Sequence, residues 1–166
     1  MKKLLLSILF MTAAFGTKAQ DAKPTKEETQ KFIGTLLSKV IGEKSSTENM
    51  ITTSQSFSSD FSAYHFADKF DNPNTFFASS DVRNIHWDDY LKCEGDKVDY
   101  APNIMSVTLF FSSKVERENK IDNDKKVDNG YIFWVVIPVE KFASVEKALL
   151  RLSEIAKEEN KDPFKN

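Results

Sequence analysis

The chain has 166 residues, of which 40% are hydrophobic, 29% are charged and 14 are phenylalanine. This composition excludes a disordered chain and predicts one globular domain with a Phe-rich core. The formal net charge is −2, and it falls to −5 if the three lysines among the first 19 residues are removed. Nucleic acid is not an expected partner, because the chain lacks the excess of basic residues that binding to phosphates requires.

The first 19 residues have the layout of a secretory signal peptide. Two lysines precede an apolar run over residues 4–15, which is too short to span a membrane. Thr17 and Ala19 are small residues that place the cleavage site before Gln20. We therefore expect a bacterial protein that is exported to the periplasm or secreted. Gln20 is not a cysteine, so a lipoprotein is not expected, and no later apolar segment is long enough for a transmembrane helix.

After cleavage, a short polar tail over residues 20–24 is expected to lead into one domain over residues 25–160, with a frayed tail over residues 161–166. Thr25 and Glu28 have the T-x-x-E spacing of a capping box, which predicts a helix start. This helix is predicted to end at Gly42. Its apolar residues recur at intervals of three and four and so share one face: Phe32, Ile33, Leu36, Leu37, Val40 and Ile41.

From residue 54 onward, β-branched and aromatic residues predict a sheet. Strands are expected at residues 54–57, 61–66, 75–78, 82–87, 90–94, 105–111 and 131–137. The gaps are too short for helical crossovers, so antiparallel pairing is favoured. The polar stretch over residues 112–128 is predicted to be a solvated hairpin loop. The last strand is almost continuously apolar, which predicts that it is central and covered on both faces.

A closing amphipathic helix is predicted from Ser144 as its N-cap, with an apolar face that comprises Val145, Ala148, Leu149, Leu152, Ile155 and Ala156. The element order predicts an α+β fold. An N-terminal helix precedes an antiparallel, strongly bent sheet or partly open barrel of about six or seven strands, and the C-terminal helix packs on that sheet.

In element order, residues 57–160 resemble the pleckstrin-homology-like barrel, in which a terminal helix plugs the open end. The resemblance implies a binding or scaffolding role. The basic phosphoinositide-reading loop of some members has no match in this chain, so the resemblance does not extend to lipid-headgroup binding. A leading helix against a curved sheet, as in cystatin-like and NTF2-like folds, is the alternative.

The densest polar group in the sequence, at residues 86–94, provides a candidate metal site. His86 and Asp88 would share one face of a strand, and His65 would join them if the strands at 61–66 and 82–87 were adjacent. The alternative is that these are solvent-facing strand and turn residues. No cofactor is predicted.

Aromatic residues provide a candidate ligand surface. Most of those between residues 57 and 77 are expected in the core, because a sheet usually buries phenylalanine. Phe66, Trp87 and Trp134 are the candidates for ligand binding. A tryptophan exposed on a concave sheet would favour a ligand site, whereas two buried tryptophans would favour a purely structural role.

The sequence contains no catalytic motif. Cys93 is the only cysteine and has no neighbouring base, and neither a G-x-S-x-G turn nor a phosphate-binding loop occurs. The sequence therefore predicts an exported, non-enzymatic protein that binds an unknown protein or small-molecule partner, or helps to organise the envelope. The alternatives are a carrier of small apolar ligands in an aromatic-lined barrel and a metal-dependent enzyme centred on His65, His86 and Asp88.

Overall fold

The computed structural model describes residues 23–44, 49–70, 77–122 and 124–161, and the structural statements below refer to these residues. The predicted signal peptide, the start of the strand expected at residues 75–78 and most of the C-terminal tail lie outside them. No helix in the described part of the chain is long and apolar enough to cross a membrane.

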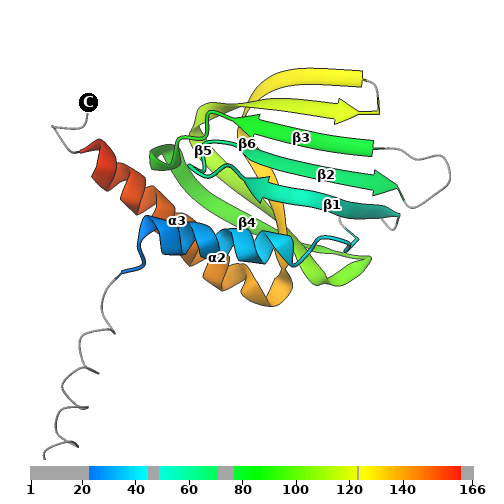
Figure 1. Ribbon diagram of the computed structural model, residues 1–166, viewed down its shortest axis with the longest axis horizontal. Helices are drawn as coiled ribbons and strands as arrows, with labels where there is room; N and C mark the ends of the chain where they lie inside the picture. The colour runs from blue at the N-terminus through cyan, green and yellow to red at the C-terminus, as the bar shows by residue number, and fades with distance from the viewer. Residues whose placement is uncertain (1–22, 45–48, 71–76, 123, 162–166) are drawn as a thin grey trace, which may run out of the picture.

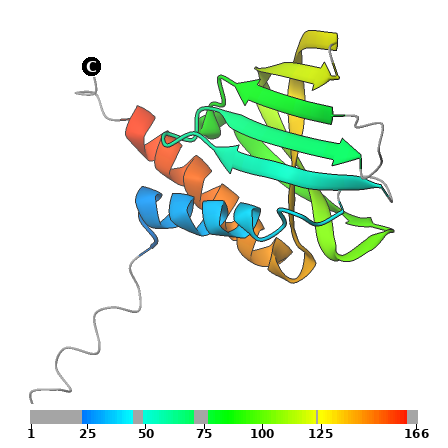
Figure 2. The ribbon, with the colours of Figure 1, turned by 45° about the vertical axis from the view of Figure 1, so that its right-hand side comes forward.

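The protein is an α+β fold in which two helices pack together against a curled antiparallel sheet (Figures 1 and 2). The N-terminal helix, the half-barrel sheet and the C-terminal helix packed on it confirm the predicted fold class. The elements are α2 (Lys26–Ser38), β1 (Met50–Phe57), β2 (Tyr64–Phe70), β3 (Phe77–Arg83), the 3-10 helix η1 (Trp87–Asp89), β4 (Tyr90–Val98), β5 (Ala101–Ile121), β6 (Asp124–Pro138), the 3-10 helix η2 (Val139–Lys141) and α3 (Phe142–Asn160).

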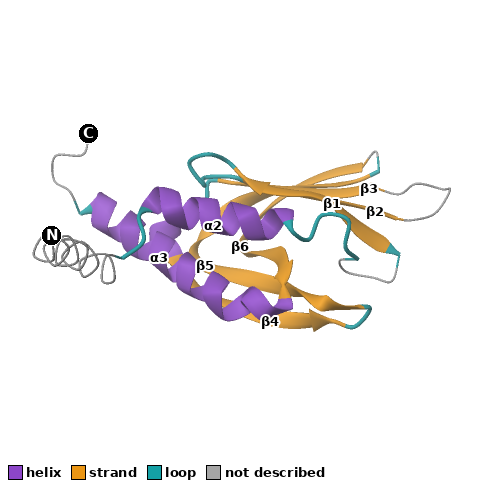
Figure 3. Ribbon diagram, turned by 60° about the horizontal axis from the view of Figure 1, so that its bottom comes forward, coloured by secondary structure: helices purple, strands orange, loops and turns teal. Residues whose placement is uncertain are grey.

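The long strand β5 joins the two parts of the sheet. Its N-terminal half pairs with β4, its C-terminal half pairs with β3, and β6 pairs with it along both halves. A register shift between Phe110 and Val115 interrupts the β5–β6 ladder, and such irregularities bend a strand pair. The sheet therefore has two layers (Figure 3). The β1–β3 layer consists of β1, β2 and β3, and the β4 layer consists of β4 with residues 101–111 of β5 and 132–138 of β6.

The predicted start of the first helix is confirmed. The Thr25 hydroxyl accepts the Glu28 N–H at 3.2 Å, and the Glu28 carboxylate accepts the Thr25 N–H at 2.9 Å. The helix ends at Ser38, earlier than expected. Gly42 instead has a left-handed φ of 91°, which glycine adopts without strain, and its N–H donates to the Thr52 carbonyl of β1 at 2.8 Å. Gly42 thus links the helix to the sheet edge.

Several boundaries differ from those predicted. The strands expected at 75–78 and 82–87 are parts of one strand, β3, and the second of them stops before Trp87 begins η1. Residues 58–63 form a turn in which the Asp60 carboxylate accepts bonds from Ser58 and Ser62, so β2 begins at Tyr64. Ser144 is not the N-cap of α3, because the helix already begins at Phe142.

The loop predicted at residues 112–128 is wrong, because most of this stretch is β-structure. β5 extends to Ile121 and β6 begins at Asp124. Polar residues maintain this hairpin through cross-strand ion pairs, such as Arg117 with Asp128 at 2.7 Å. The central position predicted for the last strand is also wrong. Among the described residues β6 pairs with β5 alone, and Trp134 of β6 is exposed.

The core lies between the helices and one face of the β4 layer. Val107, Leu109, Phe133 and Val135 project from that face, and all four are buried. Aromatic rings fill the adjoining space with centroid separations of 4.6–6.4 Å, and this ring cluster comprises Phe57, Phe61, Tyr64, Trp87, Tyr90, Phe111 and Phe133. The Phe-rich core that the composition predicts is therefore present.

The side chain of Gln55 hydrogen-bonds β1 to β6. Gln55 is buried, and its Nε2 donates to the Val136 carbonyl at 2.7 Å while its Oε1 accepts the Val136 N–H at 2.6 Å. The Tyr64 hydroxyl donates to the same Oε1 at 2.7 Å. The side-chain amide therefore takes the place of one peptide group in a neighbouring strand. We call this arrangement the Gln55 clasp.

Removal of the Gln55 clasp should destabilise the fold. Gln55→Leu leaves the Val136 N–H and C=O and the Tyr64 hydroxyl without their buried partner, which we expect to lower the free energy of unfolding by about 2–4 kcal/mol. Urea denaturation measures this change. Ser56→Ala, at the next and exposed position of β1, should change stability by less than about 0.5 kcal/mol. Equal effects of the two substitutions would contradict the assigned role of the clasp.

Two glycines should respond in opposite directions to alanine. A Cβ at Gly95 of β4 would meet Met105 Sδ of β5 and would lie 2.9 Å from Phe142 Cε2 at the start of α3. A Cβ at Gly34 of α2 has no neighbour within 4 Å. We expect Gly95→Ala to destabilise the protein by about 1–3 kcal/mol through overpacking. Gly34→Ala should stabilise it by about 0.5–1 kcal/mol through helix propensity. Thermal unfolding of both variants tests how closely β4 packs against Met105 and the start of α3.

Candidate functional site

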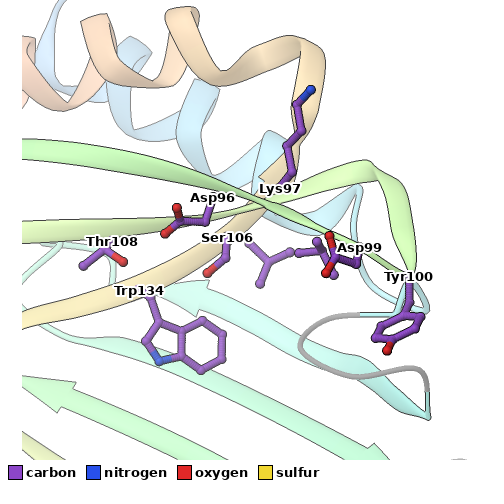
Figure 4. Close-up of a pocket in the computed structure, with 9 residues that line it drawn as sticks. Asp96, Lys97, Asp99, Tyr100, Ser106, Thr108 and Trp134 are labelled. Carbon is purple, nitrogen blue, oxygen red and sulfur yellow. The ribbon is translucent and has the colours of Figure 1, made fainter.

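The main candidate site is a cleft on the face of β6 opposite the core. Successive side chains of a strand point to opposite faces, so Phe133 and Val135 project from one face of β6 and Trp134 and Val136 from the other. On this second face Val136 is buried, whereas Trp134 is exposed. The cleft has a volume of about 380 Å³. We call it the Trp134 cleft, and it is lined by Asp96, Lys97, Val98, Asp99, Tyr100, Ser106, Thr108, Trp134 and Val136 (Figure 4).

Strand register places the polar groups of the cleft. Ser106 of β5 pairs with Asp96 of β4 on one side and with Val136 of β6 on the other. Thr108 pairs with Trp134 in the next row on the same face. The polar and apolar side chains of the cleft thus stand on three adjacent strands, whose hydrogen-bonded ladders fix their spacing. The hairpin between β4 and β5 adds Asp99 and Tyr100 (Figure 4).

Trp134 is the principal aromatic group of the cleft. Its side chain is 37% exposed, and its ring packs against Phe66 with a centroid separation of 4.3 Å and an interplanar angle of 64°. A smaller cavity beyond it is lined by both rings together with polar residues of the sheet, including Ser80 and Asn119. Phe66 and Trp134, two of the three predicted ligand-binding residues, therefore meet beside the cleft.

Trp87, the third predicted ligand-binding residue, lies elsewhere. It is only 7% exposed, and its Nε1 donates to the Phe61 carbonyl within the core at 2.8 Å. The two tryptophans thus have different environments, with Trp87 buried and Trp134 open to the cleft. The sequence does not reveal this difference, because Trp134 stands in an almost continuously apolar run, which predicts burial, whereas Trp87 stands between His86 and Asp88.

The cleft combines several kinds of chemical group. The ring of Trp134 offers an apolar face, Ser106 and Thr108 offer hydroxyls, and Asp96 and Asp99 offer carboxylates. The side chain of Lys97 points away from the Trp134 ring (Figure 4). The cleft is therefore an aromatic surface with a negative charge, which suits a ligand that has an apolar part and a cationic or hydroxyl-bearing part.

The residues predicted to bind a metal lie at separate places. His65 borders a surface depression of about 330 Å³ on β2 and β3, whereas His86 and Asp88 border another of about 170 Å³ beside α3. Asp88 accepts a hydrogen bond from Asn160 Nδ2 at 2.8 Å. Within the described ranges, no group of three or more His, Cys, Asp or Glu side chains is arranged to hold a metal ion. The three residues are thus not brought together.

His65 belongs instead to a polar network on the outer face of the β1–β3 layer. Its Nδ1 lies 2.6 Å from Asp81 Oδ1, and its Nε2 lies 2.9 Å from Ser54 Oγ. Asp81 stands opposite Glu118 across the β3–β5 ladder. The sequence pointed to His65 but gave no signal for Ser54 or Asp81, because these residues are 11 and 16 positions away and only strand pairing brings them together.

No protein family model, curated protein or solved structure matches this chain. The resemblance to pleckstrin-homology-like barrels stays a prediction from element order. The functional argument therefore depends on the chemistry of the sites themselves.

The ion pairs of Glu118 should make stability depend on pH. Hydrogen bonds from Lys125 at 2.7 Å and Lys120 at 3.0 Å lower the pKa of Glu118 from its usual 4.5 to about 2. A carboxyl group whose pKa is lower in the folded state stabilises the fold above its unfolded pKa, and this contribution disappears as pH falls through the folded pKa. Glu118→Gln should therefore destabilise the protein at pH 7.

The difference in stability between wild type and Glu118→Gln should shrink as pH falls from about 4.5 to about 2, as proton linkage requires. Urea denaturation at a series of pH values measures it. Glu116→Gln is the matched control, because the ion pair of Glu116 with Arg83 is longer, at 3.8 Å, and should contribute less. A difference for Glu118→Gln that stays constant across this pH range would contradict the role assigned to the ion pairs.

Proposed function

We propose that the protein is an exported binding protein whose ligand occupies the Trp134 cleft and carries a cationic amine next to an apolar group. The observation that carries this proposal is the partly exposed ring of Trp134 in a cleft that also contains two carboxylates. Export is part of the proposal and is supported by the signal peptide predicted over residues 1–19.

The position of Trp134 supports a ligand site. Single exposed apolar side chains are common on protein surfaces and need no functional explanation. Trp134 differs from these because it lines a concave surface and its ring is held by contact with Phe66. A ring that is already held in place loses little conformational freedom when a ligand covers it, which favours affinity.

The charge of the cleft supports a cationic ligand. A cation can be attracted by the face of an indole ring and by carboxylates at the same time, whereas an anion would be repelled by Asp96 and Asp99. The hydroxyls of Ser106 and Thr108 can accept hydrogen bonds from the N–H groups of a protonated amine or from a hydroxyl group on the ligand. An amine with a methylated or otherwise apolar end would therefore match both kinds of lining.

The same lining argues against the alternative function, in which the protein carries purely apolar ligands. A hydrocarbon in the Trp134 cleft would cover Asp96 without offering it a hydrogen bond, and an unpaired buried charge is costly. The aromatic residues that suggested a carrier mostly pack against one another in the core, as the ring of Phe133 does on those of Tyr64 and Phe111. The cleft thus favours a mixed polar and apolar ligand.

Choline and its uncharged isostere 3,3-dimethylbutanol form a matched pair of probes. We expect choline to produce a saturable change in tryptophan fluorescence, because Trp134 is exposed to the cleft while Trp87 is buried. The isostere should bind at least about tenfold more weakly, which corresponds to about 1.4 kcal/mol. Trp134→Phe should abolish the signal, and circular dichroism should verify that the variant is folded.

Charge variants complete the test. Asp96→Asn should weaken choline binding by about tenfold, or about 1.4 kcal/mol. Asp124→Asn is the matched control, because Asp124 is exposed at the start of β6 and is not part of the cleft lining. Equal binding of both probes would support the apolar-ligand carrier instead. Absence of binding by both would refute the assignment of this cleft to small amines.

A further inference from the structure

We propose that Ser54, His65 and Asp81 form a Ser–His–Asp triad that hydrolyses small, unhindered carboxylic esters on the outer face of the β1–β3 layer. This activity is separate from ligand binding in the Trp134 cleft. In β2, Phe66 points towards Trp134, and the preceding residue His65 points to the opposite face.

The three residues come from three adjacent strands. His65 of β2 pairs with Ser56 of β1 on one side and with Asp81 of β3 on the other. Ser54 lies two residues before Ser56, and its Oγ is 2.9 Å from His65 Nε2. Asp81 Oδ1 is 2.6 Å from His65 Nδ1. The two antiparallel ladders therefore hold nucleophile, base and carboxylate in a fixed order across the sheet.

The order of the contacts matches the needs of nucleophilic catalysis. When Asp81 accepts the proton on Nδ1, the neutral imidazole has its lone pair on Nε2, which faces the Ser54 hydroxyl. A simple ion pair would need only one ring nitrogen. In this network both nitrogens are engaged, with the carboxylate on Nδ1 and the hydroxyl on Nε2, which is the arrangement that orients a base towards a serine.

The site is accessible to a substrate. The side chain of His65 is 41% exposed and that of Asp81 is 28% exposed. A depression of about 330 Å³ adjoins the imidazole, with Ser56, Ser58 and Arg83 among its lining residues. Ser54 is not part of this lining; it is half-buried on the other side of the imidazole. Because the depression is small and has both polar and apolar lining residues, it suits a short acyl ester rather than a long-chain lipid ester.

The reaction proceeds in two balanced steps. Ser54 Oγ bonds to the acyl carbon while its proton moves to His65 Nε2, and the bond to the leaving alcohol breaks as the alcohol takes that proton. A water molecule then attacks the acyl-serine and gives a proton to His65 Nε2. The carboxylic acid leaves as Ser54 Oγ recovers the proton.

The test uses the purified exported protein with p-nitrophenyl acetate and a fluorophosphonate probe. We expect release of p-nitrophenolate and a covalent phosphonyl adduct that peptide mass spectrometry maps to Ser54. Ser54→Ala should abolish the adduct and lower the hydrolysis rate at least about tenfold, since a positioned base contributes 10²–10⁴-fold in enzymes. Ser79→Ala is the matched control, because Ser79 lies two residues before Asp81 on β3 and is not part of the lining of the depression, and it should retain both.

Asp81→Asn tests the orientation of His65. The amide can donate to Nδ1, which would leave the ring proton on Nε2 and remove the base that faces Ser54. This variant should retain the fold by circular dichroism but lose adduct formation. An adduct on another residue, no adduct at all, or hydrolysis that Ser54→Ala leaves unchanged would each overturn the proposal. None of these results depends on ligand binding in the Trp134 cleft.

Discussion

The Gln55 clasp is the contact on which the two-layer arrangement depends. The β4 layer is linked to the β1–β3 layer by the bend in β5 and β6, and a bend alone leaves the angle between the layers free. Gln55 fixes that angle, because both of its amide atoms bond to the backbone of Val136 and a third bond comes from Tyr64. Each of these buried polar groups is satisfied, so the clasp costs little despite its burial.

The clasp also explains why one strand can serve both the core and the cleft. Through the bonds of Gln55 to Val136, the edge of β6 lies against β1. β6 thereby divides the space between the two layers into two parts. Phe133 faces the part that the helices and aromatic rings fill, whereas Trp134 faces the part that stays open. The cleft therefore follows from side-chain alternation along β6 once the strand edge is held in place.

The features that the sequence predicts well are local ones. The capping box of Thr25 and Glu28 and the apolar face around Leu149 depend on neighbours within one or two helical turns. The features that it misses depend on pairing between distant segments. The hairpin that contains Arg117 and Asp128 looks like a loop because its partners are charged rather than apolar. The contacts of His65 with Ser54 and Asp81 exist only through strand register, which hydrophobic periodicity does not encode.

The charged hairpin also contributes to the environment of the proposed triad. Asp81 and Glu118 stand directly opposite each other across β3 and β5, and like charges at such positions repel. Glu118 is paired with Lys120 and Lys125 from the extended hairpin. Arg83 of β3 lies 3.7 Å from it as well, so cations from both sides of the ladder offset its charge. Asp81 can then direct its carboxylate towards His65 on the other side. The environment of Asp81 therefore depends on the whole hairpin, which supplies both the facing carboxylate of Glu118 and the two lysines that neutralise it.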